Sequence, residues 1–355
     1  MKQELEPDLM ASKKVSRRVF VGAALVGTGA AAGALLRRSQ ESAVPPAGSA
    51  TIDASEFAYD VSEFARTDPK LLLYQPAGTF PTGMERVKRL TVDSTGRIWV
   101  AGDRMVGQFS PTGEAGRQLK LERPPHALWA GRDGELVVAL GNFFEVYDGQ
   151  GRLRLRSPRL GEDSFLTAVA VEGATIYLAD AGRREVLQCD RGTGEITGRF
   201  GRKDQPAGNP GFVVPSPYFD LAVSRGRLHV TNPGRLRVET YTLDGRFESS
   251  WGSPGLAPNR FCGCCNPVYF TLRPNGGFLT SEKGLTRIGV YGADGSFEGL
   301  VAGPDTLVDD KELAKRACQD CRLGGGFDVA CDAAGRVFVL DPFRKSVRVF
   351  VPRSA

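Results

Sequence analysis

Apolar and polar positions alternate in short stretches along most of this chain, most clearly between residues 326 and 351. Apolar side chains recur there with a period of two in three short runs, and turns rich in Asp, Gly and Pro separate the runs. This pattern is typical of antiparallel β-strands joined by hairpins. One such unit cannot bury both faces of its own sheet, so the segment predicts further copies elsewhere in the chain.

Five other segments repeat the pattern when the copies are aligned on their second strand. Most copies carry one strand before it and two after it, and the steps between copies run from 38 to 59 residues. Four strands repeated at about 40 residues or more are typical of a β-propeller blade. The sequence therefore predicts an all-β, six-bladed propeller over residues 71–355, with second strands at 96–100, 134–138, 174–178, 226–230, 276–280 and 335–339.

The two ends of the repeat region predict how the ring is closed. The sixth copy ends after its third strand, near Val351, and residues 71–80 resemble the fourth strand of the other copies. Closure of a ring of blades removes exposed sheet edges. We therefore expect an N-terminal strand to complete the last blade.

The segment before the repeats has the features of an export signal. The pair Arg17 and Arg18, followed by Phe20, precedes a weakly apolar run at 19–36 and resembles the twin-arginine signal. A plain membrane anchor is the alternative. The high Gly and Ala content of the run favours the export signal, which makes the twin-arginine machinery an expected partner.

This interpretation divides the chain into three parts: a signal or membrane anchor at 1–38, a linker and lead-in rich in Ser, Ala, Pro and Gly at 39–70, and the propeller. It predicts an exported protein, either periplasmic or anchored to the outer face of the cytoplasmic membrane. Contact with the membrane is expected only through residues 19–36, and only if that segment is retained.

The formal net charge of +5 does not point to an acidic partner. Residues 1–38 carry seven basic and three acidic side chains, which leaves 39 basic and 38 acidic residues in the remainder. A nearly neutral propeller gives no reason to expect nucleic-acid binding.

Several copies share a more specific motif: an apolar strand, Asp-x-x-Gly, a second apolar strand and a short Asp or Asn turn. It is seen in Val92-Asp93 to Val100 and again in Cys331-Asp332 to Asp341. These repeats resemble those of NHL-type six-bladed propellers. The resemblance implies the fold but no single activity, since propellers of this type serve as enzymes, binding modules and scaffolds.

Propeller topology predicts which side chains meet at the mouth of the central channel. The turn between the second and third strands of a blade returns to the face where the first strand begins, as do the loops between blades. Long loops on a rigid scaffold often carry function. The candidates for this channel mouth are His126, Asp180, Asn232, Glu282, Lys283 and Asp341, although Asp and Asn side chains also commonly cap their own turns.

Five of the seven cysteines lie in two of these long loops, at Cys262, Cys264, Cys265, Cys318 and Cys321. Topology brings both loops to the same face of the ring, at blades five and six. The other two, Cys189 and Cys331, fall in strands and are interpreted as core or turn residues. Clustered thiolates repel one another unless a cation or a covalent bond neutralises them, and a disulfide between adjacent residues is strained.

Three functions remain open on these observations. The first is an exported binding or redox scaffold that carries an iron–sulfur cluster or zinc on four of the five cysteines, with a protein or redox partner. In that case Asn266 and Lys283 are expected to contact the ligands. The second is a disulfide-stapled interaction propeller, since disulfides form in oxidising compartments. The third is a metal-dependent hydrolase or lyase, similar to lactonases, that uses the channel mouth.

Overall fold

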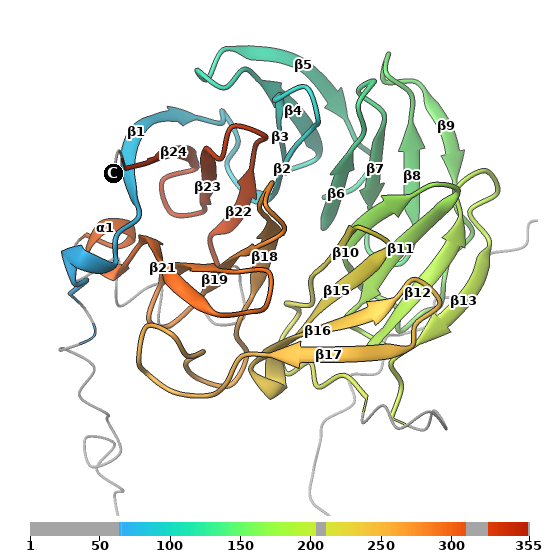
Figure 1. Ribbon diagram of the computed structural model, residues 1–355. Helices are drawn as coiled ribbons and strands as arrows, with labels where there is room; N and C mark the ends of the chain where they lie inside the picture. Colours follow the sequence, from blue (N-terminus) through green and yellow to red (C-terminus); the bar gives the residue numbers. More distant parts are fainter. Residues whose placement is uncertain (1–63, 65, 204–210, 310–325, 354–355) are drawn as a thin grey trace, which may run out of the picture. The chain divides into compact units, whose positions relative to one another are not determined.

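The computed structural model describes residues 64, 66–203, 211–309 and 326–353. All of them belong to one compact unit, residues 59–355. This unit consists of six four-stranded antiparallel sheets, and Figure 1 shows them arranged around a common centre. The six-bladed, all-β propeller predicted from the repeats is confirmed.

The first three sheets follow the chain, each from its inner to its outer strand. Their strands are β2 (Val87–Val92), β3 (Ile98–Gly102), β4 (Met105–Phe109), β5 (Ala115–Lys120); β6 (Ala127–Ala130), β7 (Leu136–Ala139), β8 (Phe144–Tyr147), β9 (Leu153–Arg156); β10 (Leu166–Glu172), β11 (Thr175–Asp180), β12 (Glu185–Asp190) and β13 (Ile196–Phe200).

The other three sheets have the same order, except that the sixth takes its outer strand from the start of the described chain. Their strands are β14 (Leu221–Ser224), β15 (Arg227–Asn232), β16 (Arg237–Thr242), β17 (Phe247–Trp251); β18 (Tyr269–Leu272), β19 (Phe278–Glu282), β20 (Arg287–Tyr291), β21 (Phe297–Ala302); β22 (Asp328–Cys331), β23 (Val337–Asp341), β24 (Ser346–Pro352) and β1 (Tyr74–Pro81).

Apart from Phe64, helical structure among the described residues is confined to three single turns: the 3-10 helices η3 (Pro69–Leu71) and η4 (Pro233–Arg235), and α1 (Pro304–Leu307). No helix in this part of the chain has the length and apolar character needed to cross a membrane. The expected export signal lies outside the described residues.

The six innermost strands contact one another in a ring, from β2 through β6, β10, β14, β18 and β22 back to β2. The core is divided among six apolar clusters, one between each pair of neighbouring sheets. Each sheet buries its apolar faces against the neighbouring sheets, so a single blade cannot be stable alone and the alternating pattern has to repeat along the sequence.

Strand β1 lies beside β24 in the sixth sheet, with Tyr74 opposite Pro352 and Pro81 opposite Ser346. Residues 71–73, which the sequence placed within this strand, precede it instead. Leu71 ends η3, and the backbone N–H of Leu73 donates to the carbonyl oxygen of Leu300 at 2.9 Å. The lead-in to β1 is thus attached to the outer strand of the fifth sheet.

Candidate functional site

The side chains that the sequence analysis assigned to the channel mouth from the second turns of the blades accept hydrogen bonds from nearby backbone N–H groups. Asp180, Asn232, Glu282 and Asp341 are fully buried. Oδ1 of Asp180 accepts hydrogen bonds from the backbone N–H groups of Phe165 and Arg183, at 2.9 and 3.1 Å. Asp341 accepts in the same way from two residues of its own turn.

Two of these side chains hold the long loop that leads into their blade. Oδ1 of Asn232 accepts from the N–H of Val213, at 2.9 Å. Glu282 accepts from the N–H of Cys262 at 3.0 Å and forms a buried ion pair with Arg287. A buried carboxylate that is paired and hydrogen-bonded satisfies the requirement for burial of a charge. Asn232 and Glu282 therefore anchor these two loops to their blades.

His126 stands apart from these carboxylates. Its ring packs against that of Phe165, with 4.7 Å between ring centroids. Burial, together with the nearby charge of Lys88, lowers the pKa of His126 to about 4, so the imidazole is neutral at pH 7. Within the described residues, no three His, Cys, Asp or Glu side chains are grouped closely enough to hold a metal ion.

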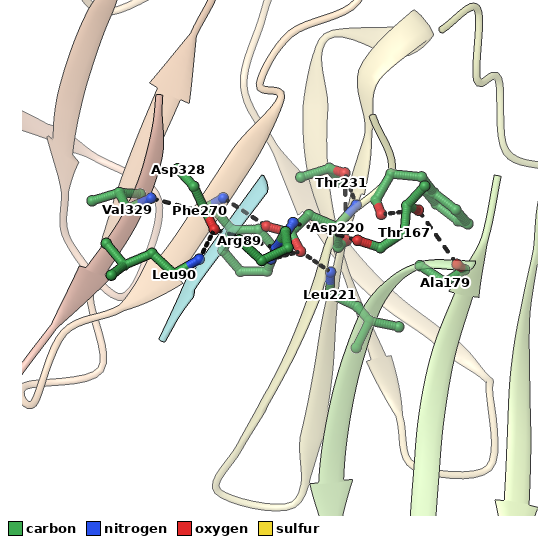
Figure 2. Close-up of polar contacts among 11 residues, drawn as sticks. Arg89, Leu90, Thr167, Ala179, Asp220, Leu221, Thr231, Phe270, Asp328 and Val329 are labelled. Atoms are coloured by element: carbon green, nitrogen blue, oxygen red, sulfur yellow. Dashed lines mark hydrogen bonds and ion pairs between the residues drawn. The ribbon is translucent and has the colours of Figure 1, made fainter. Parts of the chain in front are cut away.

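The side chains that meet in the channel itself come from the first residues of the inner strands. Arg89 in β2 lies between Asp220, just before β14, and Asp328 in β22 (Figure 2). Nη2 of Arg89 is 3.0 Å from Oδ1 of Asp220, and its Nε is 3.2 Å from Oδ2 of Asp328. The three side chains, here called the channel plug, join blades one, four and six.

The two carboxylates of the channel plug also bind the free edges of neighbouring inner strands. Oδ2 of Asp328 accepts from the N–H of Leu90 in β2, and Oδ2 of Asp220 accepts from the N–H of Phe270 in β18. An inner strand pairs with only one neighbour in its own sheet, so its free edge, which faces the channel, needs other partners. The plug supplies them at two of the six blade junctions.

The electrostatics of the channel plug reflect its burial. Burial and the neighbouring charge of Asp220 raise the pKa of Asp328 to about 6, against the opposing effect of Arg89. Burial also raises the pKa of Asp220. Two carboxylates around one guanidinium leave an excess negative charge in a low-dielectric site, which favours protonation of one of them.

Beneath the plug, the inner strands enclose a cavity of about 290 Å³. Its walls include Val92, Trp129, Val223 and Leu272, all partly exposed, and Arg89 lies at the buried end. Since the residues at the plug are buried and those further along the strands are accessible, the cavity is closed at the end where the inner strands begin.

The sequence interpretation missed the channel plug, although a signal for it exists. The segments Phe219–Val223 and Phe327–Cys331 share the pattern Phe-Asp-apolar-Ala, directly before or at the start of an inner strand. Arg89 was hidden because it follows Lys88 in a basic doublet. An irregularity in the β2–β3 register between Val87 and Arg89 decides which of the two faces the channel.

A stack of cationic and aromatic side chains leads from the plug to the cysteine loop of blade five. The guanidinium carbon of Arg89 lies 4.7 Å from the centroid of the Tyr269 ring, which meets Tyr218 edge-on at 5.5 Å. Nζ of Lys283 lies 4.5 Å from the centroid of Tyr218. Such contacts stabilise a buried cation without neutralising it.

Lys283 ends beside two cysteines. Its Nζ is 3.3 Å from Oγ of Ser216, and both groups act on the pKa of the Cys265 thiol. The sulfur atoms of Cys264 and Cys265 are 3.6 Å apart, with Cys264 exposed and Cys265 buried. Burial alone would raise the pKa of Cys265, but the hydrogen bonds from Lys283 and Ser216 outweigh it and lower the pKa.

Cys262 has different surroundings in the same loop. Its thiol donates to the carbonyl oxygen of Lys283 at 3.5 Å, and Nδ2 of Asn266 donates to Cys262. Burial and the charge of Glu282 raise the pKa of Cys262 to about 11. These contacts favour a protonated thiol at Cys262, whereas the sulfur atoms of Cys264 and Cys265 lie next to each other.

The remaining cysteines separate into two groups. Cys318 and Cys321 lie outside the described residues. Cys189 is fully buried in β12, while Cys331 is partly exposed at the end of β22, and burial raises the pKa of both to about 12. None of the five cysteines in the described part of the chain forms a disulfide.

No protein-family model and no curated protein sequence matches this chain. Among solved structures it is similar to the WD40 β-propeller domain of Doa1, with a TM-score of 0.50 and 12% identity over 76% of this chain and 79% of that one. It is also similar to a streptogramin B lyase (TM-score 0.49, 15% identity, 75% of this chain and 79% of that one). A virginiamycin B lyase from Staphylococcus aureus gives 0.47 and 14%, over 77% and 83%. At such identities the likeness shows the propeller fold alone.

Proposed function

We propose that this protein is an exported propeller scaffold that binds a soft metal centre, zinc or an iron–sulfur cluster, through the thiol pair Cys264–Cys265. The observation that carries the proposal is the sulfur–sulfur separation of 3.6 Å. Two thiolates on a tetrahedral zinc ion, with Zn–S bonds of about 2.3 Å, stand about 3.8 Å apart. The pair is therefore spaced to share one ion.

The surroundings of the pair support the same conclusion. A metal ligand must be a thiolate, and Lys283 and Ser216 favour that form of Cys265. A centre with four thiolates carries net negative charge, which the ammonium of Lys283 would offset. Groups around the ligands commonly orient them and tune the metal.

Two further ligands are needed for either centre, and we propose Cys318 and Cys321. They lie outside the described residues and precede β22 in the chain, as Cys264 and Cys265 precede β18. Cys262, whose thiol donates to the backbone carbonyl oxygen of Lys283, would be the one of the five cysteines that is not a ligand. When bound, the centre would supply electron transfer as an iron–sulfur cluster, or loop rigidity as zinc.

The proposal extends to location and family type. The Arg17–Arg18 pair would direct the folded, metal-loaded protein through the twin-arginine machinery, and the repeats would be of the NHL type. Replacement of both arginines by Lys should leave the protein in the cytoplasm, as measured by cell fractionation. Normal export of that variant would contradict this part of the proposal.

Metal and acid-labile sulfide analysis of the full chain, purified without oxygen, tests the centre. We expect one zinc, or iron with sulfide, per chain in the wild type and loss of it in Cys264→Ser and Cys265→Ser. Cys189→Ser is the matched control, because that thiol is buried in β12. Metal-free, fully stable protein with Cys264 and Cys265 in separate disulfides would contradict the proposal.

The hydrolase or lyase alternative has less support from the described residues. Its candidate carboxylates Asp180, Glu282 and Asp341 are buried and bound to backbone N–H groups. A metal in the channel mouth would have to displace these contacts. We therefore keep the thiol centre as the proposed function.

A further inference from the structure

The charge beside Cys264 and Cys265 restricts which species the two thiols bind without additional ligands. Lys283 is 97% buried, its ammonium nitrogen is 3.3 Å from Oγ of Ser216, and its charge acts on the Cys265 thiol. A divalent cation on only two thiolates would lie close to this fixed positive charge in a partly desolvated site, where repulsion between cations is strong. The pair by itself is better suited to a neutral soft species.

The same two side chains offer hydrogen-bond donors to an oxygen atom carried by that species. Lys283 has three N–H donors and Ser216 has a hydroxyl, and both lie against the Cys265 sulfur. Cys264 is an exposed residue, so the pair is accessible from solvent. The site therefore combines two thiols, an entrance and a donor pair for oxygen.

We propose that Cys264 and Cys265 bind a trivalent metalloid hydroxide of the arsenite type, with Lys283 and Ser216 holding its remaining hydroxyl group. This inference rests on the proposed function only in that the pair binds a soft element. It does not depend on Cys318 or Cys321.

The binding step is a condensation in which no atom changes oxidation state. Arsenous acid, As(OH)₃, reacts with two thiols, two As–S bonds form and two As–O bonds break. Each thiol proton leaves with a hydroxyl group as water, so two waters are released. The product retains one As–OH group, the oxygen of which would lie beside the Lys283 ammonium.

Two arsenic compounds distinguish binding that uses Lys283 and Ser216 from binding through the two thiols alone. Arsenite retains a hydroxyl after it binds two thiols, whereas phenylarsine oxide, which carries a phenyl group on arsenic, retains no oxygen. Lys283→Met should weaken arsenite binding about tenfold or more, the scale of one charge-assisted hydrogen bond. Binding of phenylarsine oxide should change less than twofold. Calorimetric titration of the reduced, metal-free full chain measures both.

Three variants provide controls. Lys345→Met, a change at an exposed lysine paired with Glu85, should affect neither arsenical. Lys283→Arg keeps a cationic donor and should retain part of the arsenite affinity. The double variant Cys318→Ser/Cys321→Ser should keep arsenite binding while it loses the proposed four-thiolate centre, so failure of one proposal is distinguishable from failure of the other.

X-ray absorption at the arsenic edge gives a direct check, with two As–S and one As–O contact expected in the complex. Equal losses for both arsenicals in Lys283→Met would make the lysine a general structural support and overturn the inference. Unchanged arsenite affinity in that variant, or arsenic bound by three sulfurs, would overturn it as well.

Discussion

The second turns of the blades and the first residues of the inner strands offer the same kind of side chain at the same face of the ring, with different outcomes. Asp180 and Asp341 accept hydrogen bonds from backbone groups within or next to their own turns. Asp220 and Asp328 each accept from the backbone N–H of the residue that follows them, and in addition from neighbouring blades and from Arg89. A carboxylate on a turn has all its backbone donors within or next to that turn, whereas one at the channel takes its remaining donors from across the ring. Position in the blade therefore decides whether an aspartate anchors a loop or joins blades.

The largest effect is expected from removal of the central cation. Arg89→Met leaves two buried carboxylates without their shared partner, and loss of one member of a buried ion pair typically costs about 3–5 kcal/mol of unfolding free energy. Urea unfolding measures it. The triple variant Arg89→Met/Asp220→Asn/Asp328→Asn should recover much of the loss. A cost below about 1 kcal/mol for Arg89→Met would show that the plug does not join the blades.

The pH dependence of stability should distinguish the plug from the turns. The pKa of Asp328 is about 6 in the folded protein and 3.8 for an ordinary Asp, so between these values the folded state binds more protons than the unfolded state. The contribution of this group to the unfolding free energy therefore falls as pH rises from about 4 to about 6.

Comparison of the wild type with Asp328→Asn reports the titration of the Asp220–Asp328 pair, because His126 and His229 titrate in both proteins. We expect the difference in unfolding free energy between wild type and variant to decrease from pH 4 to pH 6 and to level off above pH 6. A difference that stays constant, or increases, over this range would contradict the raised pKa.

Smaller effects are expected at the turns. Asp180→Ala removes two hydrogen bonds to backbone N–H groups and should cost about 1–2 kcal/mol, the scale of a lost cap. Because Asp180 and Asp341 hold backbone groups and bind no metal in this account, the metal content of Asp180→Ala and of Asp341→Ala should equal that of the wild type. If either variant lost bound metal or a metal-dependent activity while its melting temperature stayed unchanged, the result would support a catalytic site at the channel mouth.

The blade count could be predicted from the sequence because it depends on local patterns. Each second strand has its own alternation and its own turn residues, and six copies of this signal lie in order. The sequence also places Lys283 and Cys265 at one face, since both follow from the repeat register.

The pairings across the ring could not be predicted in this way. Arg89 and Asp220 are 131 residues apart, and Asp328 lies a further 108 residues along the chain. No periodicity links their side chains, and a register irregularity in β2 separates Arg89 from Lys88. The contrast between Cys262 and Cys265 has the same origin. It depends on which side chain receives the Lys283 ammonium and which faces a backbone carbonyl.

An experimental structure of the full chain, purified without oxygen, tests the central claim most directly through the anomalous signal at the thiol pair. We predict a soft metal bridging Sγ of Cys264 and Sγ of Cys265, with the two sulfurs about 3.6–3.8 Å apart and Cys262 unbound. A disulfide from either cysteine to another part of the chain, with no metal signal at the site, would contradict the account.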